Sequence, residues 1–230
     1  MDSLDDFVKV QHPTALRPLL GQTVLAVEDS RFACEAIRLV CLKSGARIRR
    51  ADCLHSAHRH LRVYRPSVVL VDMGLPDGSG IELVKELVAA TPRVPVIMAM
   101  SGDDSLEEDA LAAGADGFLT KPIASLAAFQ TAILAHLPAD RRPNGPRALM
   151  DDDINPDCLA FQDDLDHALE ALTAGEGAYA AQFLASLAQC IGDNALADQA
   201  STLAHAPESE KETAKMRALI TKRAGHREAV

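Results

Sequence analysis

The sequence predicts a doubly wound α/β domain followed by a small all-helical domain, and two observations carry this prediction. From Thr23, short runs rich in Val, Ile and Leu alternate with longer amphipathic stretches, which is typical of βα units around a parallel sheet covered on both faces. From Pro156, apolar residues recur at spacings of three and four, which is typical of helices packed in a bundle.

Five βα units are expected in the first domain. The apolar runs predict strands at Thr23–Val27, Ala46–Ala51, Ser67–Val71, Pro95–Met100 and Asp116–Leu119. The stretches between them predict helices over Arg31–Lys43, Leu54–Tyr64, Gly80–Ala90, Ser105–Ala113 and Ser125–Leu137. Gly45 and Gly114 stand where the C-caps of two of these helices belong, because glycine adopts the left-handed conformation of that position without strain.

A break in the pattern after Leu137 separates the two domains. The next nine residues contain three prolines and a glycine, which predicts a linker. Four helices are then expected, with breaks at Gly175–Gly177, Gly192–Asp193 and Pro207 that leave only short connections. The predicted organisation is an N-terminal extension (1–21), an α/β domain (22–137), a linker (138–155) and a helical domain (156–230).

Composition narrows the class of protein. Hydrophobic residues make up 48% of the chain and charged residues 24%, as in a folded globular protein. The sequence contains no long apolar run, and its acidic N-terminus lacks the features of a secretory signal, so we expect a cytoplasmic protein without a membrane partner. The five cysteines are odd in number and form no Cys-X-X-Cys pair, which argues against a disulfide framework or a zinc site.

The formal charge of −10 is concentrated in the C-terminal region. Residues 151–230 contain 15 acidic and 6 basic residues, and no Lys or Arg lies between Asp151 and Glu210. A surface with this much uncompensated negative charge repels a phosphate backbone. The sequence therefore does not favour a nucleic-acid partner for the helical domain.

Polar residues follow the predicted strands at the edge where open α/β sheets bind their ligands. These residues are Glu28 and Asp29 after the first strand, Asp72 after the third, Ser101 and Gly102 after the fourth, and Lys121 after the fifth. With the flavodoxin-like strand order 2-1-3-4-5, Glu28, Asp29 and Asp72 converge. Three neighbouring carboxylates raise one another's pKa unless a cation joins them, and their oxygens suit Mg²⁺.

The same edge has the groups needed to accept a phosphoryl group. Lys121 supplies a compact positive charge and Ser101 a hydroxyl, while Asp72 is the candidate nucleophile that forms an acyl phosphate. Mg²⁺ and the lysine offset the charge of the transferred oxygens. Gly74 and Gly102 let backbone N–H groups approach the phosphoryl group without a Cβ in the way.

Four segments in order resemble the receiver domain of two-component response regulators over about Thr23–Leu137. They are Val27–Ser30, Val71–Gly80, Met100–Gly102 and Phe118–Pro122. The resemblance implies that Asp72 accepts phosphate from a histidine kinase or a histidine phosphotransfer protein. It also implies that Asp29, Asp72 and the Gly74 carbonyl bind Mg²⁺, with Glu28 acting mainly through water.

The resemblance further implies a conformational switch. Ser101 turns toward the phosphoryl oxygens and the ring of Phe118 moves inward, next to a cis Lys121–Pro122 bond. A receiver of this kind is a signalling protein whose only expected reaction besides phosphorylation is self-dephosphorylation. A homodimer formed on phosphorylation is a further expectation.

Other interpretations of the same residues are weaker. A haloacid-dehalogenase-type phosphatase requires a second aspartate where this chain has Gly74. The segment with His55, His58 and His60 is better explained by a solvated helix face than by a metal site. A solvated face, or else a site for an acidic partner, accounts for the basic region of Arg47, Arg49, Arg50, Arg59, Arg62 and Arg65.

The helical domain resembles a histidine phosphotransfer domain over Phe161–Arg223. Gln182 takes the place of the phosphorylated histidine, and Ala185–Ser186 replaces the usual Lys-Gly. A glutamine amide cannot carry phosphate, and neither His167 nor His205 has the family context. The resemblance therefore implies a binding module, and it predicts that Gln182 is exposed on a helix.

The sequence as a whole favours a phosphorylation-controlled protein-interaction switch. A stabilising helical appendage is the simpler alternative for the second domain. The other alternative is a phosphorylation-controlled transcription regulator with an atypical helical domain that contacts DNA or polymerase, which the missing basic residues disfavour.

Overall fold

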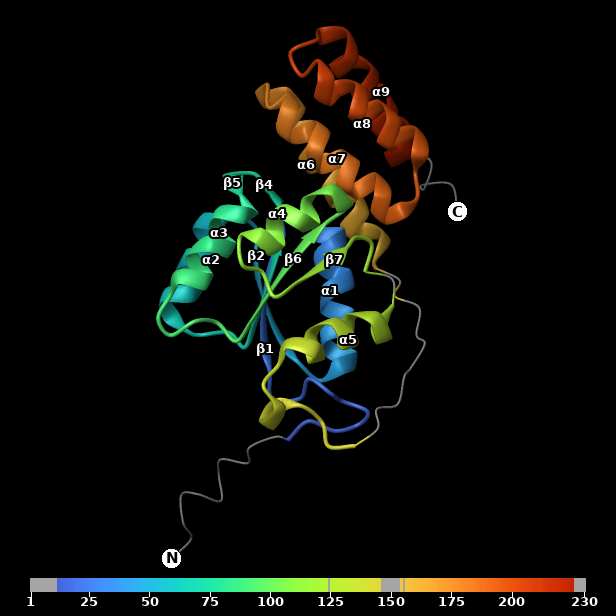
Figure 1. The fold of residues 1–230 in the computed structure, drawn as a ribbon. Helices are drawn as coiled ribbons and strands as arrows, with labels where there is room; N and C mark the ends of the chain where they lie inside the picture. Colours follow the sequence, from blue (N-terminus) through green and yellow to red (C-terminus); the bar gives the residue numbers. More distant parts are fainter. Residues whose placement is uncertain (1–11, 124, 146–153, 155, 226–230) are drawn as a thin grey trace, which may run out of the picture.

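The computed structural model describes residues 12–123, 125–145, 154 and 156–225. Its first part is built on a five-stranded parallel sheet with the order β2-β1-β3-β6-β7 (Figure 1). The strands are β1 (Thr23–Val27), β2 (Arg47–Ala51), β3 (Val68–Asp72), β6 (Val96–Ser101) and β7 (Gly117–Thr120). This order confirms the predicted flavodoxin-like sheet.

Helices cover both faces of the sheet, as the apolar strands predict. One face carries α1 (Arg31–Ser44) and α5 (Leu126–His136), and the other carries α2 (Leu54–Val63), α3 (Gly80–Ala89) and α4 (Glu107–Ala112). Alternate residues of β1 enter the two cores, because successive side chains of a strand point to opposite faces. The edge strand β2 is the exception, since its arginines are largely exposed.

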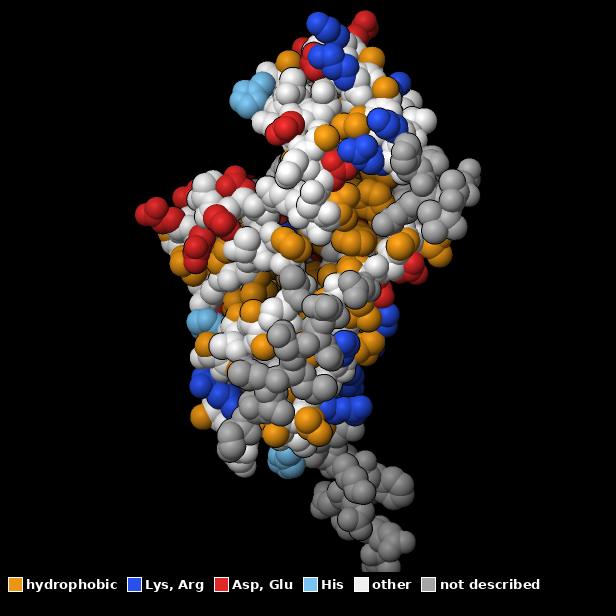
Figure 2. Space-filling view, turned by 90° about the vertical axis from the view of Figure 1, so that its right-hand side faces the viewer, with side chains coloured by type: hydrophobic (Ala, Val, Ile, Leu, Met, Phe, Trp, Pro, Cys, Tyr) orange, Lys and Arg blue, Asp and Glu red, His pale blue; other side chains and the backbone are white. Residues whose placement is uncertain are grey.

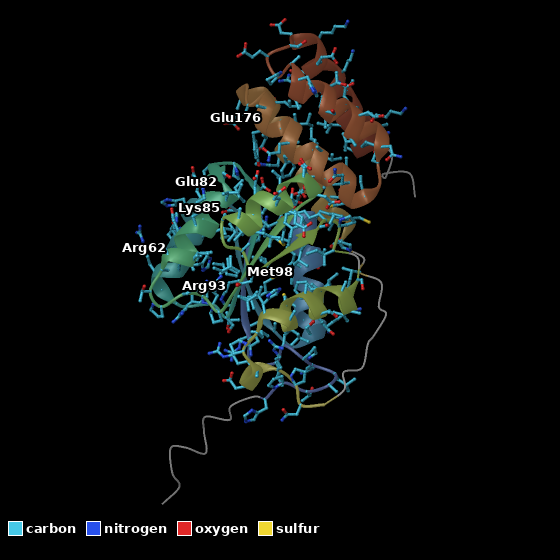
Figure 3. The ribbon with its side chains drawn as sticks, viewed as in Figure 1. Arg62, Glu82, Lys85, Arg93, Met98 and Glu176 are labelled. Carbon is cyan, nitrogen blue, oxygen red and sulfur yellow. The ribbon has the colours of Figure 1, made fainter. Side chains whose placement is uncertain are left out.

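The outer faces of the helices are polar. Figure 3 shows Arg62 on α2 and Glu82 and Lys85 on α3, which are exposed side chains. His58 is half-buried and lies 2.7 Å from Glu86, measured from Nε2 to Oε2.

Two local features differ from the prediction. A 3-10 turn over Asp104–Leu106 precedes α4, so this helix begins at Glu107, later than the predicted Ser105. A small hairpin of β4 (Gly74–Leu75) and β5 (Gly78–Ser79) was not predicted, because two-residue strands are too short to show an alternating pattern.

The second part is a bundle of four helices, as predicted. They are α6 (Cys158–Ala174), α7 (Gly177–Ile191), α8 (Asn194–His205) and α9 (Glu210–Gly225). Leu165, Leu184 and Leu203 are fully buried in its core. Figure 1 shows the bundle beyond the carboxyl ends of the sheet strands. No helix in the described ranges is long and apolar enough to cross a membrane.

The bundle packs on the first part through α6, α7 and α1. Phe32 at the start of α1 meets Phe161 of α6 edge to face, with 6.1 Å between ring centroids. Figure 2 shows hydrophobic side chains gathered on the lower part of the bundle, where it meets the α/β part. Aromatic pairs of this geometry add to the stabilisation from buried apolar area.

A single buried carboxylate of the bundle caps the first helix of the α/β part. Asp164 is 1% exposed and accepts hydrogen bonds from Ser30 Oγ (2.7 Å), Arg31 N (2.7 Å) and Phe32 N (3.0 Å). Burial raises the pKa of Asp164, and these hydrogen bonds oppose that effect. A carboxylate is favourable at a helix N-terminus, where backbone N–H groups lack partners. Docking of the bundle therefore supplies the acceptor for the free backbone N–H groups at the N-terminus of α1.

We predict that Asp164→Ala loosens the bundle from the α/β part, because three donors lose their acceptor. The free energy of unfolding should fall by about 1–3 kcal/mol, and hydrogen exchange at the Phe32 amide should accelerate. The control is Asp163→Ala, which removes an exposed ion pair with Arg31 and should have a much smaller effect. Equal effects of the two substitutions would contradict the capping role.

Candidate functional site

Three carboxylates meet at the carboxyl ends of two neighbouring strands. Each of Glu28, Asp29 and Asp72 offers a carboxylate oxygen, and these oxygens lie within 4.8 Å of one another. The cause is the parallel pairing of β1 with β3, in which Val27 lies opposite Val71. Glu28, which follows β1, and Asp72, the last residue of β3, are therefore neighbours, as the strand order predicts.

One buried cation faces this cluster. Lys121 Nζ lies 2.6 Å from Glu28 Oε2 and 3.1 Å from Asp72 Oδ1, and the lysine is 4% exposed. Its backbone N–H donates to Ser101 O at 2.8 Å, which fixes the start of the loop after β7. Burial alone would lower the pKa of Lys121, but Asp72 and Glu28 raise it, so the ammonium stays charged.

The cluster has more negative charge than Lys121 compensates. Burial raises the pKa of Glu28, with Lys121 opposing the rise and Asp72 adding to it. Burial and Asp72 also raise the pKa of Asp29 to about 6. Carboxylate oxygens are the ligands that Mg²⁺ prefers, and a divalent ion would remove this excess charge. The donor set therefore fits such an ion.

Most of the other predicted site residues lie at the same pocket. Gly74, Ser101 and Gly102 line it together with Asp29 and Asp72. Ser101 Oγ accepts a hydrogen bond from Asp103 N at 3.1 Å.

Two further predictions concern residues next to the pocket. Phe118 does not line it, because the ring is half-buried against the core under α3 and α4. The Lys121–Pro122 peptide bond is cis, as the resemblance implies.

Helix α7 of the bundle closes the pocket, which the strand-end argument did not reveal. Tyr179 donates its hydroxyl proton to Asp29 Oδ2 at 2.8 Å. The side chains of Gln182, Ser186 and Gln189 line the remaining space, a cavity of about 330 Å³. Their spacing of four and then three residues places them on one face of α7. Gln182 is exposed on a helix, as the resemblance to a phosphotransfer domain predicts.

A polar chain extends from the pocket into the bundle. His167 Nε2 lies 2.8 Å from the Tyr179 hydroxyl, and its ring packs edge to face on Phe183. Because the tyrosine proton is donated to Asp29, the histidine N–H donates to the tyrosine oxygen. Sequence reasoning missed Tyr179 and Gln189. Polar residues at helical spacing within an Ala-rich helix were the signal that marks this face.

Comparison with known proteins agrees with this geometry. The family model described as "Response regulator receiver domain" matches residues 24–133. These residues form a response regulator receiver domain. The bundle lies beyond the matched segment of the chain.

Curated relatives match the receiver domain over part of their length. The KDP operon transcriptional regulatory protein KdpE of Escherichia coli is 31% identical over 99 residues, which are 43% of this chain and 44% of KdpE. The phosphate regulon transcriptional regulatory protein PhoB of Pseudomonas aeruginosa is 30% identical over 131 residues, 56% of this chain and 55% of PhoB. The chain thus spans about half the length of the curated relatives it matches.

Solved receiver structures are also similar. The receiver domain of a sensor histidine kinase from Pseudomonas aeruginosa, described with a coordinated magnesium ion, is 27% identical. The match covers 50% of this chain and 96% of that one, with a TM-score of 0.45. A response regulator structure from Chloroflexus aurantiacus is 28% identical and covers 44% of this chain and 85% of its own, with a TM-score of 0.42.

The raised pKa of Asp29 predicts a pH-dependent stability in metal-free buffer. The folded protein holds a proton on Asp29 up to about pH 6, whereas the unfolded chain releases it near its ordinary pKa of 3.8. Protonated Asp29 therefore contributes its full stabilisation below about pH 3.8. This stabilisation is lost as the pH rises through about 6. Relative to wild type, the free energy of unfolding of Asp29→Asn should rise by about 2–2.5 kcal/mol between pH 4 and pH 7.5.

Denaturant unfolding in a chelator at the two pH values measures this gain. Asp103→Asn is the matched control, because hydrogen bonds from Ser105 lower the pKa of Asp103. Asp103 titrates at or below its ordinary pKa of 3.8 in both states, so this control should change little between pH 4 and pH 7.5. A gain for Asp29→Asn that is independent of pH would contradict the assigned titration.

Proposed function

We propose that this chain is a two-component response regulator that signals through protein–protein contacts of its helical domain. Asp72 accepts a phosphoryl group from a phosphohistidine of a histidine kinase or phosphotransfer protein. The observation that carries the proposal is the position of Asp72 in the pocket, 3.1 Å from the buried Lys121 ammonium and beneath α7.

The site residues predicted from the sequence have distinct roles in this chemistry. An Asp72 carboxylate oxygen attacks phosphorus, while Lys121 and the Ser101 hydroxyl contact the phosphoryl oxygens. The backbone N–H groups next to Gly74 and Gly102 approach the same oxygens. Asp29, Asp72 and the Gly74 carbonyl would hold Mg²⁺, with Glu28 acting mainly through water. When bound, the ion neutralises charge on the phosphoryl oxygens.

The proposed switch links the new charge to the rest of the receiver domain. The Ser101 hydroxyl turns from the Asp103 amide toward the phosphoryl oxygens. The half-buried ring of Phe118 moves inward into the space that this turn leaves. Lys121 detects the phosphoryl charge, because its ammonium already lies beside the carboxylates of Glu28 and Asp72.

The docked helical domain corresponds to the resting state in this proposal. Helix α7 occupies the face of the pocket through which a donor protein must deliver its phosphohistidine. A phosphoryl group adds about 1.5 to 2 negative charges, and the bundle contributes no Lys or Arg between residues 151 and 210 to meet them. Phosphorylation thus favours the undocked state. A shift from 1:99 to 99:1 requires about 5.5 kcal/mol.

Undocking would expose complementary surfaces for partners. The receiver side offers Phe32 and the α1 N-terminus, and the bundle offers Phe161, Tyr179 and Asp164. Because these groups already fit one another, a second copy of this chain is a candidate partner, alongside the kinase and the phosphotransfer protein. The role is that of a signalling protein, with self-dephosphorylation as its only further reaction.

A DNA-binding output is less well supported. KdpE and PhoB are named as transcriptional regulatory proteins, but the matches cover about half of each. In the bundle, three basic groups of α9 are engaged internally. Arg217 donates to Leu172 O, Arg223 pairs with Asp193, and Lys215 pairs with Glu212.

Asp72→Asn should abolish labelling of the protein by acetyl phosphate in the presence of Mg²⁺, because an amide is not a nucleophile for phosphorus at neutral pH. Radiolabel retained on the protein measures the reaction, and an unchanged unfolding transition verifies the fold. Asp77→Asn is the control, because Asp77 accepts hydrogen bonds from Leu54 N and His55 N outside the pocket and should leave labelling intact. Label that persists in Asp72→Asn would remove Asp72 as the acceptor.

Beryllofluoride with Mg²⁺, which mimics the acyl phosphate, should undock the bundle. Hydrogen exchange at the Phe32 amide should accelerate, because its bond to Asp164 is lost. Light scattering then distinguishes the outputs: a doubled mass indicates self-association, and an unchanged mass indicates a surface freed for another partner. Unaltered exchange with the mimic bound would contradict undocking as the output.

A further inference from the structure

We infer that α7 supplies the receiver domain with two water-positioning residues, Gln182 and Gln189, whose carboxamides promote hydrolysis of the acyl phosphate on Asp72. The helical domain would then act as a phosphatase in cis as well as a cover. This inference rests on the proposed phosphorylation of Asp72, and it assigns a chemical function to two residues that also contact the receiver domain.

The two amides lie against the two glycines that flank the acceptor. A Cβ on Gly74 would overlap Gln182 Nε2, and a Cβ on Gly102 would overlap Gln189 Oε1. Gly74 follows β3, which ends in Asp72, and Gly102 follows the neighbouring strand β6. Seven residues of helix separate the glutamines, about 10 Å along the axis. The amides therefore stand on either side of the phosphoryl position.

A carboxamide can hold a water molecule in a fixed orientation beside an anion. Its oxygen accepts a hydrogen bond from water and its N–H₂ donates to water or to a phosphoryl oxygen. The group is neutral, so it does not repel the phosphoryl group as a carboxylate would. Glutamine performs this task in other phosphoryl-transfer sites, where it orients the attacking water.

The reaction needs no reactant other than water. The water oxygen attacks phosphorus, the bond between phosphorus and the Asp72 carboxylate oxygen breaks, and its electron pair returns to the carboxylate. A water proton passes to a phosphoryl oxygen, and inorganic phosphate leaves. Lys121 Nζ, which lies 3.1 Å from Asp72 Oδ1, compensates the charge that returns to this carboxylate.

The pocket beneath α7 has room for this reaction. Its volume of about 330 Å³ compares with about 30 Å³ for one water molecule in the liquid. A phosphoryl group and several waters therefore fit beneath α7, whereas a second helix carrying a phosphohistidine does not. Phosphate received in the undocked state would be lost on redocking, so the bundle resets the switch.

Methionine substitutions distinguish the effect of the amide's hydrogen bonds from the effect of its volume. Gln182→Met, Gln189→Met and the double variant keep side-chain length and helix propensity but remove the hydrogen-bonding group. Gln162→Met is the matched control, because Gln162 lies on α6 and does not line the pocket. Each full-length protein is labelled with acetyl phosphate and Mg²⁺, the donor is removed, and loss of radiolabel is followed.

The double variant should retain its label at least about tenfold longer than wild type, with each single variant in between. The rate of labelling should change much less than the rate of decay, a difference that a purely structural role of the amides would not produce. Asp164→Ala, which weakens docking with both glutamines intact, should also prolong the label.

Three results would overturn the inference. Decay in the double variant equal to that of the Gln162→Met control would show that the amides do not contribute. Faster decay would show that they shield the acyl phosphate from water. A change in the labelling rate that matches the change in decay would assign them to docking alone. Label that persists in Asp72→Asn would instead disprove the proposed acceptor, and the two failures are therefore distinguishable.

Discussion

Three carboxylates held against one buried ammonium are the constraint on which this receiver domain depends. Glu28, Asp29 and Asp72 converge because β1 and β3 are parallel neighbours, and Lys121 reaches them from the end of β7. Such a cluster is costly to bury, since one cation cannot neutralise three anions. Burial and the charge of Asp72 raise the pKa of Asp29, and the excess of negative charge suits a divalent cation.

The helical domain contacts the receiver domain right beside this cluster. Tyr179 donates to Asp29, and Asp164 caps the helix that begins two residues later. Docking and the chemistry of the pocket are therefore coupled through a short segment, Asp29–Phe32. In the proposed switch, a change of charge at Asp72 would act on the edge of the interface without a long path between the sites.

Sequence patterns predicted much of the receiver domain because its signals are local. Strand periodicity located Glu28, Asp29 and Asp72 at strand ends, and the strand order then placed them together. Short elements escaped this reasoning, as the β4–β5 hairpin and the 3-10 turn before α4 show. The four helices of the bundle followed from apolar spacing, and the resemblance to a phosphotransfer domain singled out Gln182 and its exposure.

The sequence by itself determined the two folds and the acidic cluster, because both follow from hydrophobic periodicity and the order of strands. Only the tertiary structure decided that the bundle lies on the pocket, with Gln182 against Gly74 and Tyr179 on Asp29. These contacts join residues more than 100 positions apart. They depend on how two separate surfaces fit together, which no local spacing encodes.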